Sequence, residues 1–267
     1  MDGHIRRTGQ SMNRQLRQFI RRIRPLVWFY NLLSYMVGLV SFVCDLGSFL
    51  TLNNSAEYRF SFHWQAPRLG DNTSGTEFDR HYVYHPAWAA RILAETRPAG
   101  HVDISSSLHF CSIVSAFIPT HFYDYRTTDL QLNNLISDHA DILTLPFVDE
   151  SVASLSCMHV VEHIGLGRYG EPLDPAGDLK AIEELKRVLA PGGNMLFVVP
   201  VGRPRIMFNA HRIYSYAQIL SYFKGLELIE FSLVPDNPDD GGLIRNAMPD
   251  AVNAQKYGCG CFLFRKA

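Results

Sequence analysis

The sequence has few cysteines and no cysteine pair in the CxxC spacing that zinc knuckles and redox motifs use. The five cysteines are an odd number, and Cys259 and Cys261 stand too close for an easy disulfide. We therefore expect reduced thiols and a cytoplasmic compartment. The histidines are scattered, with neither an HExxH motif nor a carboxylate-rich cluster, so we expect no metal site.

The chain also lacks a strong net charge, internal repeats and low-complexity tracts. A formal net charge of −1 excludes the class of uniformly basic nucleic-acid-binding proteins, so we expect no nucleic-acid partner. The charge is unevenly spread, because residues 1–24 hold seven arginines and one aspartate. A length of 267 residues and a hydrophobic content of 47% are sufficient for a core of ordinary size.

Beyond residue 99, apolar runs typical of strands alternate with helical patterns, which predicts an α/β doubly wound, seven-stranded and mostly parallel sheet. Strands are expected at 101–105, 120–125, 140–143, 152–160, 194–200, 226–234 and 257–264, and helices at 86–97, 108–118, 178–189 and 215–223. We divide the chain into a basic and apolar helical arm (1–55), a linker with a cap helix (56–98) and a catalytic-type domain (99–267).

Acidic side chains follow three successive predicted strands. Ligands of such sheets bind at the carboxyl ends of the strands. Asp103 precedes a small-residue turn (Ser105 to Ser107) and would attract a cation such as an ammonium group; the alternative is a serine-rich helix cap. Asp124 suits the two hydroxyls of a ribose, or a surface pair with Arg126, and Asp141 suits an exocyclic amine. No G-x-G-x-x-G follows the first strand, which argues against a nicotinamide or nucleotide-sugar enzyme.

Three longer motifs resemble those of the class I S-adenosylmethionine (SAM) dependent methyltransferases. They are Asp141-Ile-Leu-Thr-Leu-Pro-Phe-Val-Asp-Glu-Ser151, His159-Val-Val-Glu-His163 and Leu185-Lys-Arg-Val-Leu-Ala-Pro-Gly-Gly193. Four further motifs are similar to a bacterial subgroup catalogued as a domain of unknown function, sometimes near surface-polysaccharide genes: residues 81–84, 162–170, 208–212 and 257–260.

The resemblance implies a Rossmann-like methyltransferase fold and SAM as cofactor. It implies cofactor contacts at Asp103, Ser105, Ser106, Asp124, Asp141, Ile142 and His159. Ser105 replaces a glycine of the family pattern. A glycine permits a positive φ and close contact with the cofactor, whereas a serine can be accommodated if φ stays negative, although its side chain takes space.

The loop after the fourth strand is the expected place for catalysis. His163 is the proposed base, since the ordinary pKa of histidine lies near neutrality. Glu162 would orient it or bind a sugar hydroxyl, and Arg168 would bind a carboxylate or phosphate. The glycines of this loop would let it close over a substrate. His211 and Arg212 can also reach the cleft at the strand ends, so both are candidates for contact with the substrate, and His211 is a further catalytic candidate. His81, Tyr82 and Tyr84 are candidates for a lid. For His163 a buried imidazole, and for His211 a helix contact, are the structural alternatives.

The arm predicts contact with a membrane. Apolar positions from Met12 to Val27 share one helical face, and arginines lie mostly off it, which favours an anionic membrane surface over docking on the chain's own domain. Leu26 to Cys44 is uncharged over 19 residues, which just spans a bilayer. A single span would separate the domain from a cytosolic cofactor. We therefore expect a hairpin broken near Gly38, or burial against the body.

Together these patterns predict a SAM-dependent methyltransferase at the cytoplasmic membrane face, in contact with it through residues 12–44. The expected substrate is a small molecule or a glycan, methylated at oxygen or nitrogen, with a lipid-linked glycan intermediate preferred. The alternative is a non-catalytic, membrane-associated scaffold with a degenerate SAM site, which Ser105 would mark.

Overall fold

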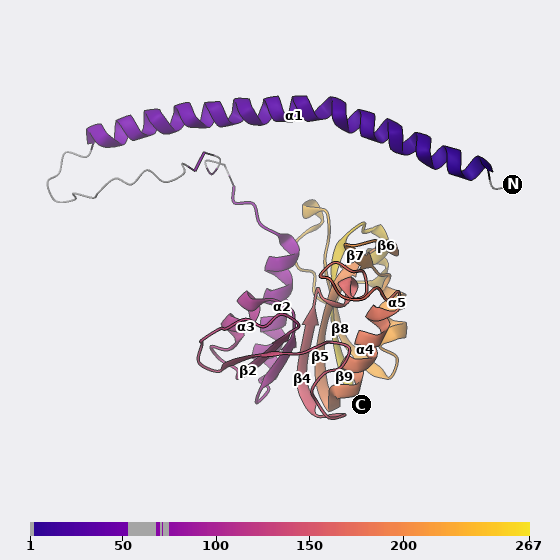
Figure 1. The fold of residues 1–267 in the computed structure, drawn as a ribbon. Coiled ribbons are helices and arrows are strands. Elements are labelled where there is room, and N and C mark those ends of the chain that lie inside the picture. The colour runs from indigo at the N-terminus through magenta and orange to yellow at the C-terminus, as the bar shows by residue number, and fades with distance from the viewer. Residues whose placement is uncertain (1–2, 53–67, 70, 72–74) are drawn as a thin grey trace. The chain divides into compact units, whose positions relative to one another are not determined.

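The computed structural model describes residues 3–52, 68–69, 71 and 75–267, which form two compact units, 1–77 and 78–267 (Figure 1). The first part of the predicted linker, residues 56–67, lies outside the described residues.

The first unit contains one long helix, α1 (Gly3–Leu52). It runs without interruption through Gly38, so the expected break there is wrong. A glycine costs a helix only about 1 kcal/mol relative to alanine, which a helix of 50 residues can tolerate. Within α1, Val27–Thr51 is 25 residues long, has a mean hydropathy of 1.7 and is not buried. By length and composition this segment can cross a membrane.

The second unit is built on a seven-stranded sheet with the order β3-β2-β1-β4-β5-β9-β8. The first five strands in this order are parallel, and β9 is antiparallel to both of its neighbours. The expected seven-stranded, mostly parallel sheet is therefore confirmed. The strands are β1 (His101–Ile104), β2 (Thr120–Asp124), β3 (Leu135–His139), β4 (Val152–Met158), β5 (Leu189–Val201), β8 (Leu226–Val234) and β9 (Gly258–Lys266).

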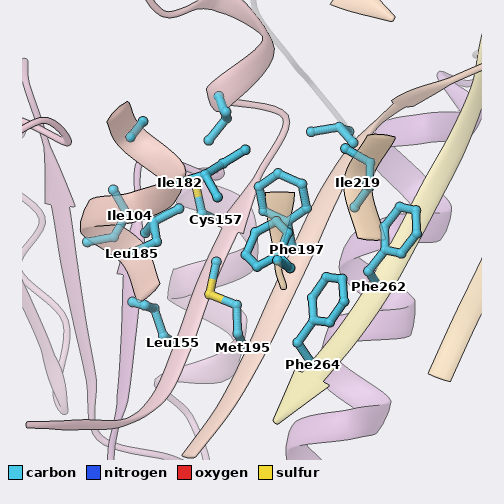
Figure 2. Close-up of a cluster of buried hydrophobic side chains, with 14 of the residues drawn as sticks. Ile104, Leu155, Cys157, Ile182, Leu185, Met195, Phe197, Ile219, Phe262 and Phe264 are labelled. Carbon is cyan, nitrogen blue, oxygen red and sulfur yellow. The ribbon is translucent and has the colours of Figure 1, made fainter. Parts of the chain in front are cut away.

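Helices cover both faces of this sheet. Consecutive residues of β5 point to opposite faces and are apolar and buried, so both faces have to be covered. Phe197 belongs to one buried cluster with Ile182 of α4 (Gly177–Val188) and Ile219 of α5 (Tyr216–Tyr222) (Figure 2). Phe262 and Phe264 of β9 belong to the same cluster. Val198 belongs to the opposite cluster, with residues of α2 (Arg80–Thr96) and α3 (Leu108–Val114). Short 3-10 turns occupy Val161–His163, Pro238–Asp240 and Pro249–Ala254.

Three local predictions are wrong. The third strand is β3, five residues earlier than expected, because Asp141 bridges to Thr144 in a turn. Helix α2 begins at Arg80, capped by the Asp79 side chain, and contains Pro86 in its interior. Pro191 and the two glycines after it were expected to form the loop that ends the helix, but they lie inside β5, which begins directly after α4. The hairpin of β6 (Arg205–Met207) and β7 (His211–Ile213) was not expected.

Candidate functional site

A pocket of about 300 Å³ opens at the carboxyl ends of the parallel strands, where ligands of such sheets bind. Ser105 follows β1, Asp124 ends β2, Asp141 follows β3 and His159 follows β4. All four line the pocket, with Tyr125, Arg126, Ala140, Ile142, Leu143, Val160, His163, Ile164, Gly165, Tyr169, Glu171, Pro172, Asp174 and Gly177. The volume is at the lower end for small-molecule sites.

Two of the expected cofactor residues do not line this pocket. Asp103 is fully buried, and its carboxylate accepts hydrogen bonds from the Ser156 hydroxyl and, at 2.9 Å, from the Ser106 N–H. The Ser106 hydroxyl accepts from the Met158 N–H at 3.0 Å. Both side chains therefore hold the turn after β1 against β4, contrary to the expected direct contact with the cofactor.

Ser105 adopts a left-handed backbone with φ of +56°, so the condition under which a serine was expected to be accommodated, a negative φ, is not met. Its N–H and its hydroxyl both donate to the Tyr123 carbonyl, at 2.8 and 3.2 Å. The backbone path that a glycine permits is thus kept, at a cost of about 1–2 kcal/mol for a residue with a Cβ. Ser105 remains at the pocket wall without breaking the turn.

Asp124 and Asp141 bring two carboxylates to one pocket beside the buried Ile142. One oxygen of Asp124 accepts from the Arg126 N–H at 2.8 Å, and one oxygen of Asp141 accepts from the Leu143 N–H at 2.9 Å. Within the described residues, the second oxygen of each has no hydrogen-bond partner. Each side chain is therefore oriented by the backbone and keeps acceptor capacity for a ligand.

Glu162 holds His159 and not His163. It is 1% exposed, and its Oε1 accepts from His159 Nδ1 at 2.8 Å, whereas His163 Nε2 lies 3.9 Å away. The expected orientation of His163 by Glu162 is therefore wrong. Burial opposes the charged imidazolium, but Cys259 and the Glu162 carboxylate raise the pKa of His159 above its ordinary value. Glu162 itself does not line the pocket.

His163 lines the pocket with an orientation suited to a base. Its Nδ1 lies 2.5 Å from the Ala210 carbonyl, which only accepts, so Nδ1 carries the proton and Nε2 keeps its lone pair. Arg168 is exposed, stacks on Tyr169 and also donates to the Ala210 carbonyl, at 3.3 Å. Arg168 lies outside the pocket lining.

His211 and Arg212 differ in their roles. The His211 ring lies 6.4 Å from that of His163, outside the pocket lining, and burial lowers the pKa of His211. Arg212 is 4% exposed and donates to the carbonyls of Ile164 and Pro175, at 2.7 and 3.2 Å. It therefore holds the loop after β4 in place, contrary to its expected role in binding substrate.

The three glycines of that loop all have positive φ. Gly165, Gly167 and Gly170 are spaced as G-x-G-x-x-G, but they follow the 3-10 turn and do not open a helix. A Cβ on Gly165 would lie 2.0 Å from the Asp174 carbonyl oxygen, so this glycine allows two loop segments to touch. Its role here is close packing at the pocket wall.

The fold assembles a cluster that sequence spacing could not reveal. Potential metal-ligand atoms of His81, His159 and Cys259 all lie within 4.8 Å of one another. Of the expected lid residues, His81 and Tyr82 reach this region, where the Tyr82 ring stacks on His159 at 5.6 Å. Tyr84 instead packs against Phe78. The pocket residues that were missed, such as Pro172 and Asp174, carry no sequence signal beyond following β4.

Comparison with known proteins concerns the fold. A family model described as "Caenorhabditis protein of unknown function, DUF268" matches residues 120–240. The chain is similar to a solved structure of a putative sarcosine dimethylglycine methyltransferase from Galdieria sulphuraria, with 16% identity over 69% of this chain and 86% of that chain, and a TM-score of 0.49. It is also similar to a SAM-dependent methyltransferase, possible histamine N-methyltransferase, from Thermotoga maritima, with 14% identity, 70% and 90% coverage and a TM-score of 0.48.

A third similar structure is the N-methyltransferase NodS from Bradyrhizobium japonicum in complex with S-adenosyl-L-homocysteine, with 14% identity, coverage of 69% and 86%, and a TM-score of 0.47. No curated protein sequence matches the chain.

Proposed function

We propose that the chain is a SAM-dependent methyltransferase that modifies an oxygen or nitrogen acceptor. The observation that carries the proposal is the pocket shared by Asp124, Asp141 and His163. It holds two backbone-oriented carboxylates beside an apolar wall, and an imidazole whose Nε2 carries a lone pair and lies 3.4 Å from Arg168 Nη1. Free acceptor oxygens suit the hydroxyls and amine of an adenosine.

SAM supplies a methyl group on a sulfonium, so the protein has to position the acceptor and remove its proton. Asp124 is assigned to the ribose hydroxyls, and Asp141 and Ile142 to the adenine. Ser105 shapes the turn nearest the amino-acid part. His163 Nε2 takes the proton of the acceptor, and the Ala210 carbonyl holds the ring in the required tautomer.

The proposal extends to the place and the acceptor. We place the unbroken apolar segment Val27–Thr51 in the plane of the inner membrane surface, because a single span would separate the second unit from a cytosolic cofactor. This location supports a glycan or lipid-linked glycan acceptor. Extraction tests this part. If the full chain is released into buffer without detergent or high salt, the lipid-linked acceptor is abandoned while the cofactor assignment stands.

Calorimetric titration of the full chain in mild detergent, with SAM and with its demethylated product, tests the cofactor. We expect micromolar binding, and a loss of about 10- to 100-fold in Asp124→Asn, because hydrogen bonds to a charged acceptor contribute about 1.5–3 kcal/mol. Asp129→Asn, at an exposed aspartate outside the pocket lining, is the matched control. Absence of binding at millimolar ligand in a folded sample would favour the non-catalytic scaffold.

A second assay tests the base. SAM consumption is measured against a panel of glycan and small-molecule acceptors. For an acceptor that is turned over, His163→Gln should lower kcat by about 10²- to 10⁴-fold, as expected for general base catalysis, while the affinity for SAM is kept. An unchanged kcat would remove His163 from the mechanism.

A further inference from the structure

Three segments far apart in the chain bring nitrogen and sulfur ligands together. His81 comes from α2, His159 follows β4, and Cys259 lies in β9. His159 Nε2 is 3.5 Å from Cys259 Sγ. Zinc bonds of about 2.0–2.1 Å to nitrogen and about 2.3 Å to sulfur, at a tetrahedral angle, separate the two ligand atoms by about 3.5 Å. The spacing of this pair therefore suits one cation.

The surroundings of His159 are those of a metal-ligating histidine. Its Nδ1 donates to the buried Glu162 carboxylate at 2.8 Å, which directs Nε2 toward Cys259. Ligating histidines commonly donate their second ring N–H to a carboxylate, which fixes the tautomer. The other oxygen of Glu162, Oε2, is buried and has no hydrogen-bond partner among the described residues.

His85 provides an independent observation. It is fully buried, and its Nδ1 donates to the His81 carbonyl at 2.7 Å, so Nε2 carries a lone pair. Within the described part of the chain, this Nε2 has no partner. The ring lies 5.0 Å from that of His159. A buried acceptor without a donor is costly, and this one lies beside the cluster.

A cation can reach the cluster from two sides. His159 lines the main pocket, and His81, 9% exposed, lines a second pocket of about 260 Å³ together with Asp236 and Tyr257. Three protein ligands with space at the fourth position are characteristic of an open zinc site, whereas structural zinc sites have four protein ligands.

We propose that His81, His159 and Cys259 bind a divalent d-block cation, with Zn²⁺ as the preferred ion. Two imidazoles and one thiolate are a donor set of intermediate softness that suits zinc and disfavours magnesium and calcium. Binding replaces the Cys259 thiol proton and the Nε2 proton of the His159 imidazolium, and both are released to solvent as the sulfur–metal and nitrogen–metal bonds form. The inference does not depend on methyl transfer.

The experiment uses the full chain in mild detergent, treated with a chelator and titrated with Co²⁺ as a spectroscopic probe. We expect one equivalent per chain, a sulfur-to-cobalt charge-transfer absorption, and displacement of the cobalt by Zn²⁺. Elemental analysis of the protein as purified provides a second reading.

Matched variants identify the ligands. Cys259→Ala and the conservative Cys259→Ser should abolish the charge-transfer band and weaken cobalt binding by more than about 100-fold. Glu162→Gln removes a partner of a ligand and not a ligand, so it should weaken cobalt binding by only about 10- to 100-fold. Cys261→Ala, in the same strand and equally buried, should keep the band. Absence of stoichiometric cobalt binding in folded protein, or equal losses in the Cys259 and Cys261 variants, would overturn the proposal.

Discussion

His101 should make the stability of the protein fall as the pH drops. The side chain is 2% exposed, and its two ring nitrogens lie 2.8 Å from the hydroxyls of Ser154 and Ser156. Burial lowers the pKa of His101 from 6.5 to about 3. In the unfolded chain the imidazole takes up a proton below pH 6.5, whereas in the folded protein it stays neutral down to about pH 3. Stability is therefore lost as the pH falls through this window.

The size of the effect follows from the two pKa values. Between pH 7 and pH 5 the histidine term costs about 2 kcal/mol of unfolding free energy, at 1.36 kcal/mol per pH unit below 6.5. His101→Gln keeps a donor and an acceptor but cannot titrate. Urea unfolding of the full chain in detergent, followed by the fluorescence of the buried Trp88, should show a pH dependence about 2 kcal/mol smaller in the variant.

The comparison cancels the contributions of the other titrating groups, which both proteins share. His121→Gln, at an exposed histidine, controls for the removal of a histidine as such. If His101→Gln and the unsubstituted protein lose the same free energy between pH 7 and pH 5, the imidazole is not held neutral between the two serines, and the reasoning fails.

Two further predictions concern the loop after β4. Gly165→Ala should destabilise the protein by clearly more than Gly170→Ala in chemical unfolding and should abolish SAM binding, because only the former Cβ meets a carbonyl, that of Asp174. Gly170 also has a positive φ, but a Cβ added there would meet no other atom, so Gly170→Ala should cost only the left-handed backbone penalty of about 1–2 kcal/mol. Equal losses of unfolding free energy in the two variants would contradict the packing argument. Arg212→Met should cost about 3–5 kcal/mol, because it leaves the buried Asp178 without its guanidinium 3.4 Å away. Stability within 1 kcal/mol of the unsubstituted protein would refute this.

Elements with strong local patterns were predictable from the sequence. The strand β8 begins and ends at the predicted residues, 226 and 234, and α4 differs from its prediction by one residue at each end. The strand β3 was missed because Leu135–His139 contains few apolar residues and half of it is exposed, whereas 140–143 has a strand-like composition that the Asp141 turn overrides. The start of α2 was missed because a proline is favoured in the first turn of a helix and disfavoured in its interior, so the helix was expected to begin at Pro86.

The candidate site was predictable where a topological rule applies. The carboxyl ends of parallel strands meet at one edge, so Asp124, Asp141 and His163 could be assigned to a common pocket. Side-chain direction was not predictable: Asp103 turns into the core, and Glu162 holds His159. The approach of Cys259 to His159 depends on where β9 enters the sheet, which no local pattern specifies.

The position of β9 also determines the order in which the second unit can be completed during synthesis. β8 hydrogen-bonds to no strand other than β9 within the described sheet, and β9 follows every other strand in the chain. The ribosome therefore delivers β1 to β5 first, and these can pair among themselves, while β8 emerges without a sheet partner. Until residues 258–266 emerge, β5 presents an open apolar edge. This interval is the stage of biogenesis at which the nascent chain is most exposed to aggregation and most dependent on chaperones.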